Sequence, residues 1–486
     1  MAIDAISKKS FGKDVFKLVS GTIVAQVVAI CLTPIITRIF IPEIYGISSV
    51  FFSIVSIITV ISCFRYELAI VLPEDDRDAG AVFMACCLIL IFISLACIPF
   101  FFFFGDWIAG LLGNSGVMDY FFLIPLAVFI NGLYLALRYW NTRRIRFGTQ
   151  ASTQALQSVS GSGMKVGLGT LGFINPGSLI ASQIIGNGLG TLILLIQAIR
   201  CDFSLLRSSV SISCIFRQLK RYKKFPIFNI WGAFLNSISW QIPIFMFTAF
   251  FSSTVTGLYA LGMTVIQMPM SLIGSSISQV FLQRASSGRH NNTLSELARD
   301  TTSVLIILTV MPFTLLSLLG GDIFGLIFGP QWVEAGVYVQ ILGLWAMVWF
   351  VVSPLTTISI VVEKQEINLI YNIILVITRF ASLFIGGICG SVYIALFLFM
   401  LTGAIVYFGI GYICVIVWAK ASIKEIRRQV QIPVIIAICL ALLILFLSYL
   451  PITTLGICVI AVVIFFIYMC YIFKTQPLIG EYIGKR

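Results

Sequence analysis

Six ionisable residues interrupt long apolar stretches of this 486-residue chain. If those stretches cross a membrane, a charge within them is costly and usually faces a partner or a water-filled path. Five of the six are basic, which favours an anionic ligand such as a phosphate or diphosphate, because guanidinium binds it bidentately and ammonium acts as a point charge. The basic residues are Arg38, Arg65, Arg138, Lys165 and Arg379, and the acidic residue is Glu67.

Lys165 and Arg379 form the most suggestive pair. They lie 214 residues apart, which is close to the spacing of an internal repeat described below. Each is predicted near the middle of a membrane span, Lys165 in the fifth and Arg379 in the eleventh. The pattern therefore predicts a phosphate or diphosphate site with one cation from each half of the chain.

The other four charges have competing interpretations. Arg138 is predicted near the inner end of its helix, where a long basic side chain extends to the interface, and Arg38 near an outer end. Arg65 and Glu67 are two residues apart, so on a helix they do not face each other and each can pair with another helix. Glu67 is a candidate for coupling to a proton or sodium gradient, although a structural ion pair fits equally well. The predicted substrate-binding residues are Arg38, Arg65, Lys165 and Arg379.

Other kinds of chemistry lack the necessary residues. The twelve cysteines lie mostly in apolar runs without ligand spacing, and the single histidine, His290, has no partner nearby. No run has the pattern GxxxxGK[ST] that binds nucleotide phosphates. We therefore predict no cofactor, no metal ligand and no catalytic residue.

The amino-acid composition indicates a membrane protein. Hydrophobic residues make up 59% and charged residues 10%, whereas soluble domains have about 45–50% and about 25%. A soluble core cannot bury that much apolar surface. The net charge of +12 then indicates membrane topology and anionic lipid rather than nucleic acid.

The apolar runs predict an all-α polytopic membrane protein of about fourteen spans. They leave only short connections, the longest being the basic stretch 200–225. The predicted spans are 15–40, 44–72, 79–104, 119–140, 150–173, 177–199, 226–250, 255–282, 299–320, 335–362, 367–387, 390–418, 432–450 and 455–473.

Lys and Arg gather in alternate connections and in both termini, including Lys8, Lys9, Lys13 and Lys17. By the positive-inside rule, both termini are predicted to be cytoplasmic. The acidic run 74–78 also falls inside, but acidic residues carry little weight in the rule. Glycines four apart, Gly163 with Gly167 and Gly186 with Gly190, predict close helix packing.

The chain also contains an internal repeat. GDWIAGLLG at 105–113 matches GDIFGLIFG at 321–329, 216 residues later, and Gly46 corresponds to Gly257, 211 residues later. Spans one to six and seven to twelve are therefore predicted to be two parallel copies of one six-helix unit, with two extra C-terminal helices. The predicted domains are an N-terminal lobe 1–200, a basic linker 201–225, a C-terminal lobe 226–418 and the added helices 419–486.

Several short motifs resemble those of a known family. They are RYELAI at 65–70 before an acidic loop, KFPIFN at 224–229, GLYAL at 257–261 followed by ISQVF at 277–281, and TRIF at 37–40. The chain resembles the polysaccharide transporter family, which contains the Wzx-type O-antigen and capsule repeat-unit flippases. That family belongs to the multidrug/oligosaccharidyl-lipid/polysaccharide exporter (MOP) superfamily.

The resemblance implies a V-shaped two-lobe flippase in the bacterial cytoplasmic membrane. Its substrate would be an undecaprenyl-diphosphate-linked oligosaccharide, moved to the outer leaflet by ion-coupled alternating access, and its partners would include membrane lipids and other polysaccharide assembly proteins. A cationic central cavity would hold the diphosphate, with Arg38 and Arg65 at matching motif positions. By analogy, the last two spans would accommodate the polyprenyl tail.

Two other classes of function remain open. A multidrug exporter of the same fold predicts acidic cavity residues, whereas basic residues outnumber acidic ones five to one here. A membrane-embedded polysaccharide polymerase or glycosyltransferase predicts a sizeable outer loop with catalytic groups, whereas the predicted outer loops are short.

Overall fold

The computed structural model describes most of the chain, and its contacts divide the chain into two units, Met1–Gly257 and Leu258–Arg486. The N-terminal lysines, His290, two residues of the 277–281 motif and the end of the tail lie outside the described residues. The residues described are 23, 25–113, 115–209, 211–274, 277–278, 281–282, 284–285, 293–451 and 453–475.

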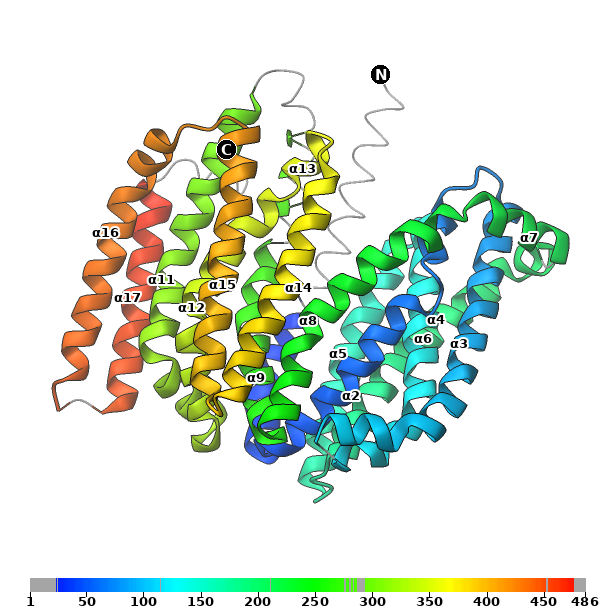
Figure 1. Cartoon of the computed structure of the whole chain (residues 1–486), viewed down its shortest axis with the longest axis horizontal. Helices are drawn as coiled ribbons and strands as arrows, with labels where there is room; N and C mark the ends of the chain where they lie inside the picture. The colour runs from blue at the N-terminus through cyan, green and yellow to red at the C-terminus, as the bar shows by residue number, and fades with distance from the viewer. Residues whose placement is uncertain are drawn as a thin grey trace. The chain divides into compact units, whose positions relative to one another are not determined.

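The first unit is a helical bundle that begins with a helix over Ala25–Ile39. Figure 1 shows its helices in blue to green. The α-helices that follow are α2 (Pro42–Ile61), α3 (Asp76–Leu111), α4 (Ile124–Arg143), α5 (Phe147–Thr170), α6 (Pro176–Ser209), α7 (Ile212–Arg221) and α8 (Ile230–Phe250). Shorter 3-10 or π segments are η1 (Tyr66–Val71), η2 (Ser115–Leu123) and η3 (Phe225–Asn229). The predicted linker 201–225 is therefore mostly helical, since α6 extends to Ser209 and α7 follows.

The second unit is also a bundle, and α9 (Ser253–Pro269) leads into it. Its α-helices are α11 (Leu294–Phe328), α12 (Val333–Leu355), α13 (Ile358–Val361), α14 (Gln365–Ile388), α15 (Val392–Tyr412), α16 (Ile423–Ser448) and α17 (Thr454–Thr475), with η4 (Met270–Gly274), η5 (Pro330–Trp332) and η6 (Ile413–Trp418) between them. The two helices outside the repeat, α16 and α17, pack on α11. Tyr468 of α17 is buried there and donates a hydrogen bond to the carbonyl of Ile307, 3.0 Å away.

Eleven helices in the described residues are long and apolar enough to cross a membrane. The other three predicted spans are also helical but miss that standard. Ala25–Ile39 and α9 are short, whereas α5 has 24 residues and is too polar. A helix this polar is not stable against lipid, so we expect its side chains to face polar partners or water rather than acyl chains.

The repeat appears in the helices as well as in the sequence. The Gly-Asp motifs are predicted to open outer loops, but α3 and α11 continue past both of them, since one Asp among apolar residues does not end a helix. Each helix ends instead just before a glycine with positive φ, Gly113 at +59° and Gly329 at +111°. Each also contains an internal proline, Pro99 or Pro312.

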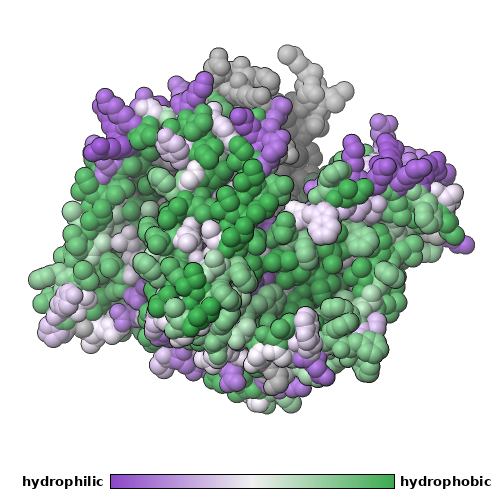
Figure 2. Space-filling model, viewed as in Figure 1, coloured by the Kyte–Doolittle hydropathy of each residue, from purple (hydrophilic) through white to green (hydrophobic). Residues whose placement is uncertain are grey.

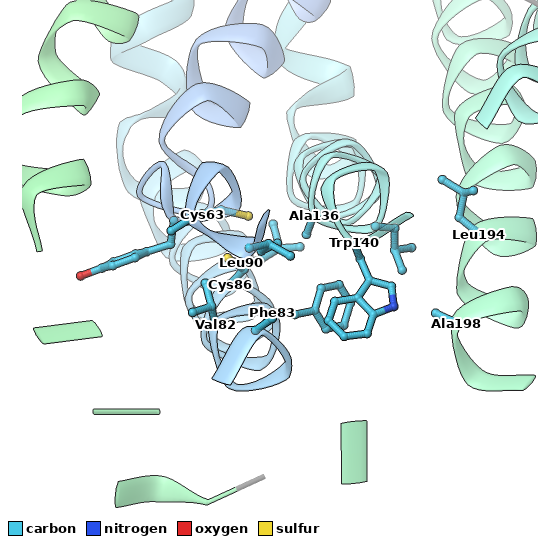
Figure 3. Close-up of a cluster of buried hydrophobic side chains, with 14 residues drawn as sticks. Cys63, Val82, Phe83, Cys86, Leu90, Ala136, Trp140, Leu194 and Ala198 are labelled. Carbon is cyan, nitrogen blue, oxygen red and sulfur yellow. The ribbon is translucent and has the colours of Figure 1, made fainter. Parts of the chain in front are cut away.

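The core of the first unit joins α3, α4 and α6. Figure 3 shows the indole of Trp140 between Phe83 of α3 and the α6 residues Leu194 and Ala198. Outside this core, apolar side chains such as Phe102 and Phe103 are exposed on the flank of α3. In Figure 2 this unit has apolar flanks, and its hydrophilic residues gather at one end around α7. A lipid bilayer covers such flanks.

Candidate functional site: charged groups within the helical units

Lys165 begins a chain of hydrogen bonds that links three helices of the first unit. Its ammonium donates to Gln183 Oε1 of α6, 2.8 Å away. The Gln183 amide donates to Asn187 Oδ1 at 3.1 Å, and the Asn187 amide donates to Asn131 Oδ1 of α4 at 2.9 Å. We call Gln183, Asn187 and Asn131 the amide ladder.

Local sequence positions the amide ladder. Gln183 and Asn187 are four residues apart, so they share one face of α6. The backbones of α5 and α6 approach closely because both carry glycine: a Cβ on Gly186 would lie 2.8 Å from the Cα of Gly161. Of the two predicted glycine pairs, Gly186 with Gly190 lies at a close helix contact. Gly163 with Gly167 does not, because a Cβ on either residue would meet nothing within 4 Å.

The amide ladder has a fixed direction, and its members are only partly buried. Every carboxamide oxygen in it accepts from the preceding group, starting at the ammonium. Lys165 and the three amides are all half-buried, so each retains some accessible surface. An ammonium with three donors beside amide groups can bind an anionic oxygen and neighbouring hydroxyl groups. Sequence reasoning found Lys165 but missed the amides, whose signal is a pair of polar residues four apart within a span.

Arg379, in the second unit, has a different environment. Its side chain is only 2% exposed, and its guanidinium lies over the ring of Phe399, 5.7 Å from the centroid. Nη2 donates to Tyr407 Oη at 3.5 Å, and both aromatic residues belong to α15. In this structure Arg379 is thus enclosed by aromatic side chains.

The two cations also lie at different positions along their helices. Lys165 is five residues before the end of α5, and Arg379 is nine residues before the end of α14. Four residues correspond to about 6 Å along a helix axis. The two cations therefore do not occupy equivalent positions along their helices.

The structure changes the interpretation of Arg65 and Glu67. The predicted span 44–72 ends at Ile61, so neither residue is on a membrane-crossing helix. Phe64 and Arg65 have positive φ values of 48° and 62°, which break the helix and start η1. In this turn, two residues that would diverge on an α-helix meet, and Arg65 Nη1 lies 3.2 Å from Glu67 Oε1.

In the Arg65–Glu67 pair, the acidic residue is buried and the basic residue is partly exposed. Glu67 has no exposed surface, whereas the Arg65 side chain is 24% exposed. Burial raises the pKa of the Glu67 carboxyl above its ordinary value, and the nearby Arg65 guanidinium opposes that rise. Glu67 is therefore suited to take up and release a proton in the connection between α2 and α3.

The two remaining cations are exposed. Arg38 lies at the end of the Ala25–Ile39 helix between the buried residues Thr37 and Phe40. Arg138 is exposed near the end of α4, as expected for a side chain that extends to the interface.

Three arginines at and just after the end of α4 join a buried ionic network. Asp202 of α6 is 1% exposed and accepts hydrogen bonds from Trp140 Nε1 at 3.0 Å and from both terminal nitrogens of Arg146 at 2.6 and 3.0 Å. Arg144 bridges Asp202 to Asp76 of α3, and Arg143 also pairs with Asp76. The network fastens three helices, which makes it structural rather than a ligand site.

Comparisons with known proteins agree on family and fold. Residues 35–337 match the family described as "Polysaccharide biosynthesis protein". No curated protein sequence matches the chain.

Solved structures with the same fold are remote in sequence. The lipid II flippase MurJ in an inward closed conformation shares 13% identity and a TM-score of 0.71, over 94% of this chain and 98% of that one. An inward-facing MATE multidrug transporter of the MOP superfamily shares 12% identity and a TM-score of 0.63, over 85% and 95%. A Vibrio cholerae MATE transporter shares 10% identity and a TM-score of 0.54, over 86% of this chain and 98% of that one. The chain therefore belongs to the polysaccharide biosynthesis protein family and has the fold of MOP superfamily transporters.

Proposed function

We propose that this protein is a flippase that moves undecaprenyl-diphosphate-linked oligosaccharide units, precursors of O-antigen or capsule, from the inner to the outer leaflet of the bacterial cytoplasmic membrane. The observation that carries the proposal is the cation Lys165 on the amide ladder, inside a helix too polar to face lipid. An ammonium suits the diphosphate, and the amides suit the hydroxyl groups of the sugar.

In the proposed cycle, the head group enters from the cytoplasmic side while the polyprenyl chain stays in the lipid. Rocking of the lobes then opens the path to the other leaflet. Arg379 joins the site when its aromatic cover on α15 opens. A proton gradient resets the cycle through Glu67, whose buried carboxyl lies beside the partly exposed Arg65 guanidinium. A sodium gradient is the alternative coupling source.

The proposal is tested by deleting the gene in its own host and restoring it with variants. Deletion should abolish the surface polysaccharide and cause a single lipid-linked repeat unit to accumulate. The wild-type gene should reverse both effects. Lys165→Ala should restore little surface polymer at normal membrane abundance, and Lys165→Arg should restore more because it keeps the charge.

Arg138→Gln is the matched control, because it removes an exposed cation from the neighbouring helix α4. It should restore the surface polymer fully. Full activity of the Lys165→Ala/Arg379→Ala double variant would contradict a diphosphate site built on these two cations.

The same strains separate the rival functions. A multidrug exporter would change drug resistance on deletion and leave the surface polymer intact. If the protein were a polymerase, its deletion would still allow the repeat unit to reach the outer leaflet. If it were a glycosyltransferase, its deletion would leave the unit unfinished. In neither case would a complete unit accumulate on the inner side.

A further inference from the structure

The short helix α7 presents three distinct faces. One face is buried against α3: Ile215 and Leu219 pack on Ala81 and Ala85. This contact places α7 beside the first turns of a helix that qualifies as a membrane span. α7 therefore lies at the level where that span reaches the membrane surface.

Beside the buried face, α7 has an exposed apolar edge. Ile212 and Phe216 are four residues apart, so they lie on the same side of the helix. They are 76% and 68% exposed. Two large apolar side chains so exposed at a span end are suited to contact lipid rather than water.

The third face is basic. At 100° per residue, Lys220, Arg217 and Arg221 follow the apolar edge around the helix, and all three are exposed. Lys223 and Lys224 continue the positive charge just beyond the helix and are also exposed. Figure 2 shows the hydrophilic residues gathered at this end of the unit.

An exposed apolar edge bordered by basic residues is the pattern of a helix that lies in the membrane interface. Its charge is complementary to anionic lipid head groups, which attract basic residues near the membrane surface. We propose that α7 docks on anionic phospholipid, with Ile212 and Phe216 among the acyl chains and Arg217, Lys220 and Arg221 at the lipid phosphates. The proposal is independent of the transported substrate.

This surface is connected to the Arg65–Glu67 pair. Tyr66, between the two charged residues, donates a hydrogen bond from its hydroxyl to the Leu219 carbonyl of α7 at 3.0 Å. Lipid docking would therefore also hold the connection between α2 and α3.

The test uses Phe216→Trp in nanodiscs made from phosphatidylcholine and phosphatidylglycerol, with one lipid or the other brominated. The chain has eight tryptophans of its own. The signal is therefore the difference between the tryptophan emission of the Phe216→Trp variant and that of the wild-type protein. Brominated chains should quench this excess emission, and brominated phosphatidylglycerol should do so several-fold more than its molar share predicts.

Two triple variants separate a specific surface from general charge. Arg217→Gln/Lys220→Gln/Arg221→Gln should remove the preference for phosphatidylglycerol. Lys424→Gln/Arg427→Gln/Arg428→Gln removes three exposed charges from α16 and should leave the preference intact. If the α7 triple variant is not recovered, the single variants Lys220→Gln and Arg221→Gln should each reduce the preference for phosphatidylglycerol.

Three results would overturn the proposal. If neither brominated lipid quenches the excess emission of the Phe216→Trp variant, then water, a protein partner or a second copy covers this edge. Equal quenching by both lipids would exclude an anionic preference. Equal loss of preference in both triple variants would assign the effect to overall charge rather than to α7.

Discussion

Gly46 and Gly257, which correspond to each other in the two sequence repeats, pack backbone to backbone in the first unit. A Cβ on Gly46 would overlap the carbonyl of Ser253, and a Cβ on Gly257 would overlap the carbonyl of Pro42. Each glycine thus meets the carbonyl four residues before the other. This reciprocal contact between the start of α2 and the start of α9 leaves no room for a side chain on either helix.

We expect Gly46→Ala and Gly257→Ala each to destabilise the protein by about 1–3 kcal/mol, because the added methyl group must displace backbone. Thermal unfolding in detergent, followed by size-exclusion fluorescence, would measure the effect. Gly163→Ala is the matched control: its Cβ would meet nothing within 4 Å, and alanine favours the helix by about 1 kcal/mol. Equal melting temperatures for all three variants would contradict the close backbone contact.

The amide ladder should matter apart from the charge on Lys165. Asn187→Leu has similar volume but leaves the Gln183 amide without its acceptor, at a cost of about 1–3 kcal/mol. Lys165 would lose its fixed position, so we expect several-fold less surface polymer in the complemented deletion strain at normal membrane abundance. Leu189→Met, at an exposed position of the same helix, should have no effect. Wild-type export by the Asn187→Leu variant would remove the amide ladder from the transport path.

Removing the charge of Asp202 should destabilise the first unit. Asp202→Asn leaves the cations of Arg144 and Arg146 without their buried counter-ion. Breaking a buried pair of this kind costs about 3–5 kcal/mol, so the variant should be recovered poorly and melt at lower temperature. Asp119→Asn, which changes an exposed carboxylate, should stay within about 0.5 kcal/mol of wild type. Similar melting curves for the two variants would exclude a stabilising role for the network.

Stability should depend on pH through Glu67. Because burial raises its pKa in the folded protein, the folded state holds this proton over a pH range in which the unfolded chain has released it. Stability contributed by the protonated form is therefore lost as pH rises through the folded pKa. Glu67→Gln keeps a neutral side chain at every pH, so its advantage over wild type in melting temperature should grow from pH 5 to pH 8.

Arg65→Gln tests the same ion pair from its basic side. It removes the charge that lowers the pKa of Glu67, so the loss of stability should move to higher pH. A wild-type protein and a Glu67→Gln variant with parallel melting profiles would show that Glu67 does not titrate in this range. Glu67 would then be a purely structural partner of Arg65.

Much of the fold could be predicted from the sequence because a membrane imposes simple rules. A long apolar run must become a helix, and the spacing of such runs located nearly every helix, including the pair outside the repeat. Boundaries were less predictable. The predicted spans 79–104 and 299–320 end too early, because α3 and α11 continue to Leu111 and Phe328, close to glycines with positive φ.

The sequence by itself determined the class, the family and the two principal cations within the helices, because charges are rare in an apolar chain and therefore conspicuous. Tertiary structure alone decided what those charges do. It placed Lys165 on amides from two other helices, enclosed Arg379 in aromatic rings and joined Arg65 to Glu67 in a turn. It also showed that Asp202 neutralises Arg144 and Arg146. The physical reason is that the cost of a buried charge depends on its partners, and those partners come from helices distant in sequence.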